Sequence, residues 1–253
     1  NDTNDCIDVF GRALTEAQTV CVSVNTNGVP GNGPSWDAVL TPDGRYAAFV
    51  SAASDLVADD TNGIPDIFVR DMESNTTRLV SVGAIGVDSN SRSLSPRISA
   101  DGRYIAFFST ATNLVPGVER SGEIYLRDMV EEITHWVSSD ALNYVETLLA
   151  GTNAISFNHT LSADGRYVAY QARRKTGDHY PALVLMFDRQ DNSTEVIHTN
   201  AFTPSADPSE IHNMSMTPDG RFLAFIANEG DSVGTNTSIF VWDGESETTV
   251  LAS

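Results

Sequence analysis

Four copies of one ten-residue motif constrain the fold of this chain more than any other feature of its sequence. The first copy reads LTPDGRYAAF, and the Asp-Gly-Arg triplets of the four copies are 58, 63 and 55 residues apart. Self-similarity at such a period indicates a chain built from equivalent supersecondary elements that pack on one another. The four copies are Leu40–Phe49, Ile98–Phe107, Leu161–Tyr170 and Met216–Phe225.

A second segment recurs behind each motif, and the two segments together predict four strands per repeat. Asp-Gly is the strongest short hairpin signal, because both residues tolerate positive φ. RYIAFFS, which follows it in the second copy, has apolar residues at alternate positions, Ile105 and Phe107, as a strand does. The second segment supplies two more strands around a short polar turn. Its copies are Asp66–Val82, Glu123–Ser139, Leu185–Thr199 and Ser238–Ser253.

Four-stranded antiparallel sheets at this spacing predict an all-β fold, a β-propeller with blades around a central channel. A β-helix needs much shorter repeats, and a sandwich has no reason to repeat its sequence. We expect a single domain over residues 1–253, with four complete blades plus an N-terminal half-blade. The half-blade covers residues 1–26, the blades cover about 35–84, 93–140, 156–200 and 211–253, and one helical turn is expected at Val145–Ala150.

The half-blade is predicted because Asp8–Val24 aligns without a gap on Asp66–Val82, the third and fourth strands of a repeat. Its two inner strands have no counterpart in the sequence, which leaves an open hydrogen-bonding edge. Three explanations are possible. The two strands lie upstream in a longer parent chain, another subunit provides them, or Asn27–Trp36 has a local fold of its own.

The segments SPRISADGRYIAF, NLVPG and EIYLRDM are similar to the TolB-like, WD-type β-propeller repeats of bacterial envelope and secreted proteins. The resemblance extends from Asp2 to Ser253. It implies a propeller that serves as a binding or scaffolding module in an extracellular, cell-surface or periplasmic location. It carries no catalytic residue across, because the repeat motif is structural.

The Asp, Gly and Arg of each triplet are expected to be turn and inter-blade anchors and not catalytic residues. We expect each arginine to bond main-chain carbonyls or a neighbouring acidic side chain. The four arginines are Arg45, Arg103, Arg166 and Arg221.

Net charge excludes two kinds of partner. The chain has 34 acidic residues against 15 basic ones, a formal charge of −19. Such a surface repels nucleic acid and anionic membranes, because both need a basic patch. No apolar run is long enough for membrane insertion. The excess of acid suits divalent cations or high solubility.

Two acidic loops are candidate sites for a structural calcium ion. Both contain the pattern D-T-N-x-x-x-D, which places oxygen ligands at positions 1, 3 and 7 and a carbonyl at position 5. The alternative is an Asx-turn loop, whose short polar side chains bond the backbone. The ligands would be Asp60, Asn62, the carbonyl of Ile64 and Asp66 in the first blade, and Asp2, Asn4, the carbonyl of Cys6 and Asp8 in the half-blade.

The two cysteines, Cys6 and Cys21, are too few for a disulfide framework. In the hairpin predicted for residues 8–24, Cys21 faces Phe10 to Arg12, several residues from Cys6. A disulfide needs its two Cα atoms within about 7 Å. A Cys6–Cys21 bridge is therefore not expected.

The sequence contains no catalytic signature of the common kinds: no G-x-S-x-G, H-E-x-x-H or C-x-x-C motif and no phosphate-binding loop. Its five histidines are scattered singly. The sequence therefore predicts a non-catalytic binding scaffold for a protein partner or for copies of itself. Two alternatives stay open. One is a self-assembling structural subunit whose half-blade a neighbour completes, and the other is a propeller-type glycosidase or lyase with paired carboxylates.

Overall fold

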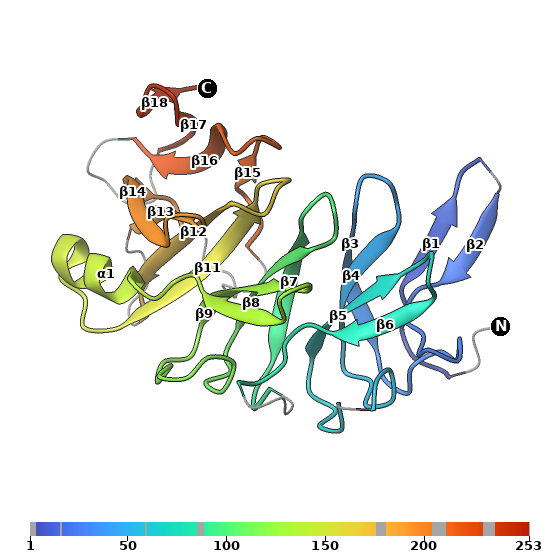
Figure 1. Cartoon of the computed structure of the whole chain (residues 1–253). Coiled ribbons are helices and arrows are strands. Elements are labelled where there is room, and N and C mark those ends of the chain that lie inside the picture. Colours follow the sequence, from blue (N-terminus) through green and yellow to red (C-terminus); the bar gives the residue numbers. More distant parts are fainter. Residues whose placement is uncertain are drawn as a thin grey trace. The chain divides into compact units, whose positions relative to one another are not determined.

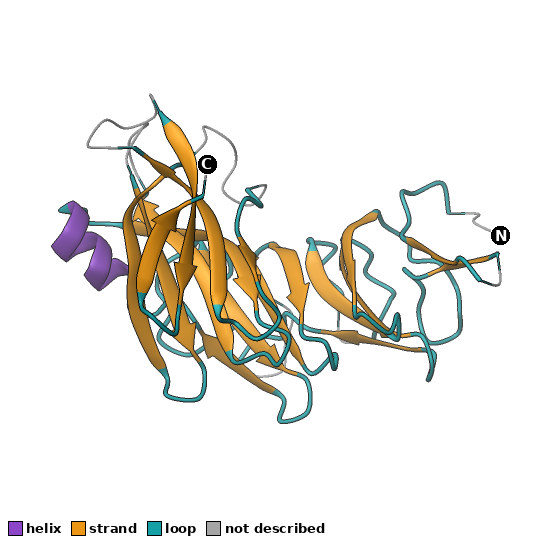
Figure 2. Ribbon diagram, turned by 90° about the horizontal axis from the view of Figure 1, so that it is seen from above, coloured by secondary structure: helices purple, strands orange, loops and turns teal. Residues whose placement is uncertain are grey.

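Strands make up nearly all the regular structure in a computed structural model of the chain (Figure 2). The chain divides into two compact units: unit 1 is residues 1–120 with 127–135, and unit 2 is residues 121–126 with 136–253. Among the described residues, no helix has the length and apolar character needed to cross a bilayer. The described residues are 4–15, 17–58, 60–84, 89–175, 181–203, 211–229 and 236–252.

Unit 1 begins with a two-stranded hairpin, β1 (Phe10–Ala13) and β2 (Gln18–Cys21). Phe10 pairs with Cys21, as the sequence predicts, and no disulfide joins the two cysteines. A four-stranded antiparallel sheet follows in the order β3–β4–β5–β6 (Figure 1). Its strands are β3 (Ser35–Leu40), β4 (Tyr46–Ser51), β5 (Asp66–Asp71) and β6 (Thr76–Leu79).

The second repeat forms a sheet of the same kind, in the order β7–β8–β9–β10. Asp-Gly again occupies the turn between its first two strands, so the hairpin prediction is confirmed here as in the first repeat. Its strands are β7 (Ser93–Ile98), β8 (Tyr104–Ser109), β9 (Glu123–Asp128) and β10 (Ile133–Trp136).

In unit 2 the third and fourth repeats share one sheet, because Ala201 in β14 pairs with Ala227 in β16. A nine-residue helix, α1 (Ala141–Leu149), packs on β11 and β12 and buries Val145, so the helix is longer than the single turn expected. The strands are β11 (Ala154–Leu161), β12 (Tyr167–Arg174), β13 (Ala182–Asp188), β14 (Ser193–Ala201), β15 (Ser215–Met216), β16 (Phe222–Asn228), β17 (Thr237–Asp243) and β18 (Thr248–Leu251).

The strand that follows the Asp-Gly-Arg turn is buried on both faces over most of its length in the first three repeats, whereas in β16 of the fourth repeat buried residues alternate with partly buried or exposed ones. Ile105, Ala106 and Phe107 are all 0% exposed, so the alternation seen in the sequence is not an alternation of burial. The alanine between the two large residues faces another covered surface. Small and large apolar residues therefore take opposite faces of a strand that has no face in water.

Each Asp-Gly-Arg turn is held by the same local hydrogen bonds. Thr41 Oγ1 donates to Asp43 Oδ1 at 2.6 Å, and the Arg45 N–H donates to the same oxygen at 2.9 Å. Gly44 takes φ +73°, a conformation in which a side chain is strained. Ser99, Ser162 and Thr217 make the first bond in the other three repeats, each at 2.6 Å.

Consecutive repeats within a unit meet at the glycine of this turn. A Cβ atom on Gly102 would overlap the ring of Tyr46, which lies one repeat earlier, and a Cβ on Gly220 would overlap the ring of Tyr167. Gly44 has no neighbour within 4 Å of its Cβ position. In these two pairs the turn therefore anchors one repeat to the preceding one, as the sequence predicts.

Gly102→Ala and Gly44→Ala form a matched pair that isolates this contact. Gly102 has φ +74° and Gly44 has φ +73°, so alanine at either position incurs a similar backbone strain of about 1–2 kcal/mol. Only the Gly102 variant also displaces Tyr46, an overpacking cost of about 1–3 kcal/mol more. Urea unfolding should show the larger loss for Gly102→Ala. Equal losses would mean that the ring contact contributes nothing.

Candidate functional site

The arginines of the four turns pair with the aspartate that ends the third strand of the same repeat, which confirms the acidic partner expected for them. Each guanidinium also lies over the ring of the next residue, with its Cζ 4.7–5.0 Å from the ring centroid. A side chain engaged on two sides in this way positions a turn. The ion pairs are Arg45–Asp71 at 3.0 Å, Arg103–Asp128 at 2.8 Å, Arg166–Asp188 at 2.7 Å and Arg221–Asp243 at 2.9 Å.

This pairing stabilises the ionised form of the aspartates. The hydrogen bond from Arg221, followed by one from the Glu245 N–H, lowers the pKa of Asp243 to about 2. The hydrogen bond from Arg45 likewise holds the pKa of Asp71 well below its ordinary value. These two aspartates therefore stay charged near neutral pH and are poor candidates for proton transfer there.

The loop predicted to bind calcium in the first repeat is closed by its own hydrogen bonds. Asn62 Oδ1 accepts the Ile64 N–H at 2.6 Å, and Asn62 Nδ2 donates to Asp66 Oδ2 at 3.1 Å. Asp66 Oδ1 accepts hydroxyls from Ser81 and Ser89, both at 2.6 Å. Asp60 is fully buried. The carboxylate oxygens of Asp66 and the amide of Asn62 are thus all engaged within the chain.

The N-terminal loop repeats this arrangement. Asn4 Oδ1 accepts the Cys6 N–H at 3.0 Å, Asn4 Nδ2 donates to Asp8 Oδ2 at 2.9 Å, and Ser23 donates to Asp8 Oδ1 at 2.5 Å. Asp2 lies outside the described residues.

In both loops the asparagine turns its amide nitrogen, and not its oxygen, toward the aspartate. This fits the Asx-turn alternative. Within the described ranges, no three His, Cys, Asp or Glu side chains gather as ligands of one metal ion. Calcium at these loops stays a prediction.

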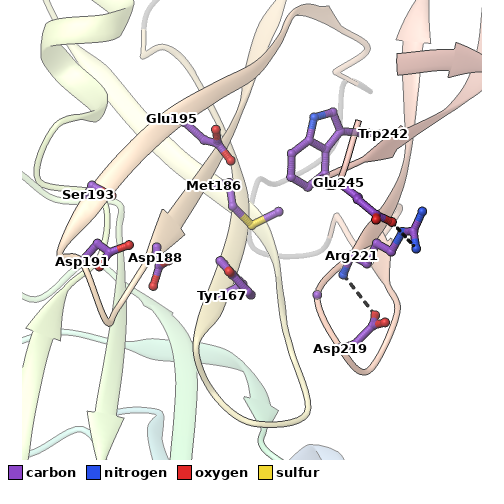
Figure 3. Close-up of a pocket in the computed structure, with 12 residues that line it drawn as sticks. Tyr167, Met186, Asp188, Asp191, Ser193, Glu195, Asp219, Arg221, Trp242 and Glu245 are labelled. Carbon is purple, nitrogen blue, oxygen red and sulfur yellow. Dashed lines mark hydrogen bonds and ion pairs between the residues drawn. The ribbon is translucent and has the colours of Figure 1, made fainter. Parts of the chain in front are cut away.

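Unit 2 contains a groove of about 490 Å³ between its third and fourth repeats, which the sequence did not reveal. Met186, Tyr167 and Trp242 form its apolar wall, and carboxylates approach from β13, β14 and the turns of the fourth repeat (Figure 3). The groove is lined by Tyr167, Met186, Asp188, Asp191, Ser193, Glu195, Asp219, Gly220, Arg221, Trp242, Gly244 and Glu245.

Most charged groups of this groove already have a partner. Arg221 pairs with Asp243 and Glu245, and Asp219 accepts hydrogen bonds within its own turn. Glu195 differs, since none of the described residues makes a hydrogen bond or ion pair with its carboxylate. Glu195 is exposed on β14, but partial desolvation by the surrounding protein, and then the charges of Glu247 and Asp188, raise its pKa. Glu195 is therefore the group in the groove that would gain most from an added cation.

No family model matches the sequence, and no curated protein matches it. Solved structures do share its fold. An oligogalacturonate lyase in complex with manganese matches with a TM-score of 0.58 and 12% identity, over 96% of this chain and 58% of the lyase. A prolyl endopeptidase matches with a TM-score of 0.56 and 13% identity, over 94% and 31%. The β-propeller domain of the Trilobed protease from Pyrococcus furiosus matches with a TM-score of 0.51 and 15% identity, over 87% and 57%.

These likenesses show a propeller-type fold, and at such low identity they show no function. The chain spans 31% to 58% of the length of these three structures. Two TolB structures also match, with TM-scores of 0.35 and 0.49, and these values are too low to support an argument. The TolB-like resemblance therefore still rests on the repeat motif.

Asn62→Asp separates the two interpretations of the acidic loops. The substitution keeps the oxygen that accepts the Ile64 N–H but places a carboxylate oxygen against Asp66. In a chelator we expect a loss of about 1–3 kcal/mol in the free energy of unfolding, because a hydrogen bond becomes a repulsion. The Asx-turn interpretation also predicts that calcium leaves the melting temperature of the native chain unchanged. A calcium-dependent rise, larger in the variant, would establish a metal site instead.

The Arg221–Asp243 pair should make part of the stability depend on pH. Because the folded pKa of Asp243 is about 2 and its ordinary value is 3.8, the pair stabilises the fold above about pH 4. This contribution is lost as the pH falls through about 2. The melting temperatures of native chain and Asp243→Asn variant should therefore differ most at neutral pH and converge between pH 4 and 2. A constant difference across that window would contradict the assignment.

Proposed function

We propose that the chain is a non-catalytic binding module built as a β-propeller of four complete blades plus a half-blade, in one domain. The repeat motif, the antiparallel sheets and the propeller-type neighbours support the architecture. The resemblance to envelope and secreted propeller repeats supports a location at the cell surface, in the periplasm or outside the cell. Its partner is a protein or a further copy of the chain.

The groove of unit 2 is the observation that carries this proposal. It joins an apolar wall, with Trp242 only 8% exposed, to a carboxylate that no described group neutralises. Concave sites with an apolar lining and a few polar groups are where proteins bind ligands. Among the described residues that line it there is no histidine or cysteine, and the hydroxyl groups are those of Ser193 and Tyr167. This inventory suits recognition better than nucleophilic chemistry.

A self-assembling subunit is the second candidate, and the N-terminal hairpin favours it. Phe10 in β1 is 50% exposed, whereas its counterparts Phe68 and Tyr125 are 0% exposed beneath neighbouring strands. Gly44 is open where Gly102 and Gly220 each receive a tyrosine ring from the preceding repeat. A neighbouring copy that adds strands to β1 would cover both positions.

Light scattering of the purified chain distinguishes these candidates. A binding module gives the formula mass of 27.3 kDa at all concentrations, with or without a chelator. A polymer would contradict that expectation and support strand addition. In that case Phe10→Ser should reduce the polymer, while the equally exposed Leu148→Ser in α1, at 49% exposure, should leave it unchanged.

Turnover assays test the third candidate, an enzyme. We expect no conversion of oligogalacturonate, with or without manganese, and none of short proline-containing peptides, because no described residues form a nucleophile–base pair in the groove. Product formation above a protein-free control would overturn the non-catalytic proposal. Glu195→Gln would then show whether the groove is the active centre.

A further inference from the structure

The groove of unit 2 has a counterpart in unit 1 that is occupied by an arginine of the chain itself. This second groove, of about 190 Å³, lies between the first and second repeats and is lined at the equivalent positions. Arg78 of β6 lies opposite Val69 of β5, as Glu195 of β14 lies opposite Met186 of β13. One strand position therefore holds a cation in one groove and an anion in the other.

Arg78 crosses its groove to reach the next repeat. Its Nη2 pairs with Glu132 Oε1 at 2.9 Å, and its Nη1 donates to the carbonyl of Met129 at 3.1 Å. Both acceptors belong to the turn between β9 and β10. Glu132 has φ +59°, a left-handed conformation that sets the direction of its side chain. The guanidinium thus bridges two repeats through a carboxylate and a main-chain oxygen.

The same two acceptors are present in unit 2. Glu247 lies four residues after Asp243, as Glu132 lies four residues after Asp128, and it has the same left-handed backbone with φ +52°. Gly244 takes the position of Met129, because the N–H of each donates to the carbonyl of its turn arginine, Arg221 or Arg103, at 2.8 Å. Unit 2 therefore keeps the acceptors for a guanidinium, but it has Glu195 at the position where unit 1 has Arg78.

The groove of unit 2 is also larger than its counterpart, at about 490 Å³ against about 190 Å³, and its wall contains an indole ring. Gly244 in place of Met129 removes a side chain, and the Trp242 ring lies against the position where a Cβ on Gly244 would be. Met186 and Trp242 line the groove between Glu195 and Glu245 (Figure 3). A flat apolar surface beside carboxylates suits a planar guanidinium, which stacks on aromatic rings and binds carboxylates with two parallel hydrogen bonds.

We propose that this groove binds an arginine side chain of a protein partner, whose guanidinium takes the place that Arg78 fills in unit 1. The inference rests on the proposed binding function and names the chemistry that the site recognises. Glu195 and Glu247 accept the guanidinium, and Met186 and Trp242 cover its aliphatic stem. A single positive charge then neutralises two carboxylates that have no other cation among the described residues.

The probe is the blocked tripeptide acetyl-Gly-Arg-Gly-amide, with citrulline in place of arginine as the uncharged isostere. We expect saturable heat in calorimetry and a change in tryptophan fluorescence with the arginine peptide, and neither signal with the citrulline peptide. The lysine peptide should bind more weakly, because an ammonium group cannot pair with two carboxylates in one plane. Equal binding of the citrulline or lysine peptide would overturn the proposal.

Two variants of Glu195 locate the site. Glu195→Gln should weaken arginine-peptide binding about tenfold or more, as expected for the loss of a charge-assisted pair. Glu73→Gln, which removes one exposed carboxylate in unit 1, is the control for net charge and should leave binding unchanged. Glu195→Arg should abolish binding and raise the melting temperature, since it restores the internal arginine. Unchanged binding in both Glu195 variants would overturn the assignment.

Failure of this inference is distinct from failure of the proposed function. If the chain converts no substrate and also does not bind the arginine peptide, the proposal of a binding module stands and the proposal of an arginine ligand fails. Arg78→Glu adds an independent check, because it removes the internal arginine of unit 1. The groove of unit 1 then has two carboxylates but lacks an indole ring and keeps the Met129 side chain, so we expect a second arginine-peptide site of lower affinity.

Discussion

The ion pair between the turn arginine and the aspartate of the third strand is the interaction on which each repeat depends. It joins the hairpin of the first two strands to the end of the third, across 22 to 26 residues of sequence. The same turn presents its glycine to the tyrosine of the preceding repeat, in both pairs that lie within one unit. One short motif therefore fixes the inside of a repeat and its junction with a neighbour, because a charged pair and a close backbone approach leave little freedom.

The rigidity of this frame allows a single side chain to change the character of a groove. The turn, the aspartate and the tyrosine recur in both grooves, so these parts of the two walls are equivalent. Arg78 lines the groove of unit 1 and pairs with Glu132 of the next repeat, whereas Glu195 leaves the groove of unit 2 acidic and open. Because the two grooves have the same backbone, they can be compared position by position. The groove of unit 1 contains an arginine, and the groove of unit 2 has no cation at the equivalent position.

The acidic loops illustrate how far residue types alone can support an interpretation. D-T-N-x-x-x-D has the oxygen atoms of a calcium loop, and it also has the donors and acceptors of an Asx turn. In the structure the side-chain amides of Asn62 and Asn4 each accept a main-chain N–H and donate to the aspartate, as in an Asx turn. Serine hydroxyls donate to the remaining oxygen of each aspartate. The choice depends on Ser89 and Ser23, which lie 23 and 15 residues from the aspartates they contact.

The sequence by itself determined the repeat, the Asp-Gly hairpins and the antiparallel strands, because these depend on local backbone preferences and on a motif written four times. It did not single out Glu195, which is one acid among 34. Only the tertiary structure decided which carboxylates have partners. Arg78 and Glu132 are 54 residues apart, and no local pattern in the sequence records that they meet across a groove. Pairing of charges is a property of distance in space, and the fold sets that distance.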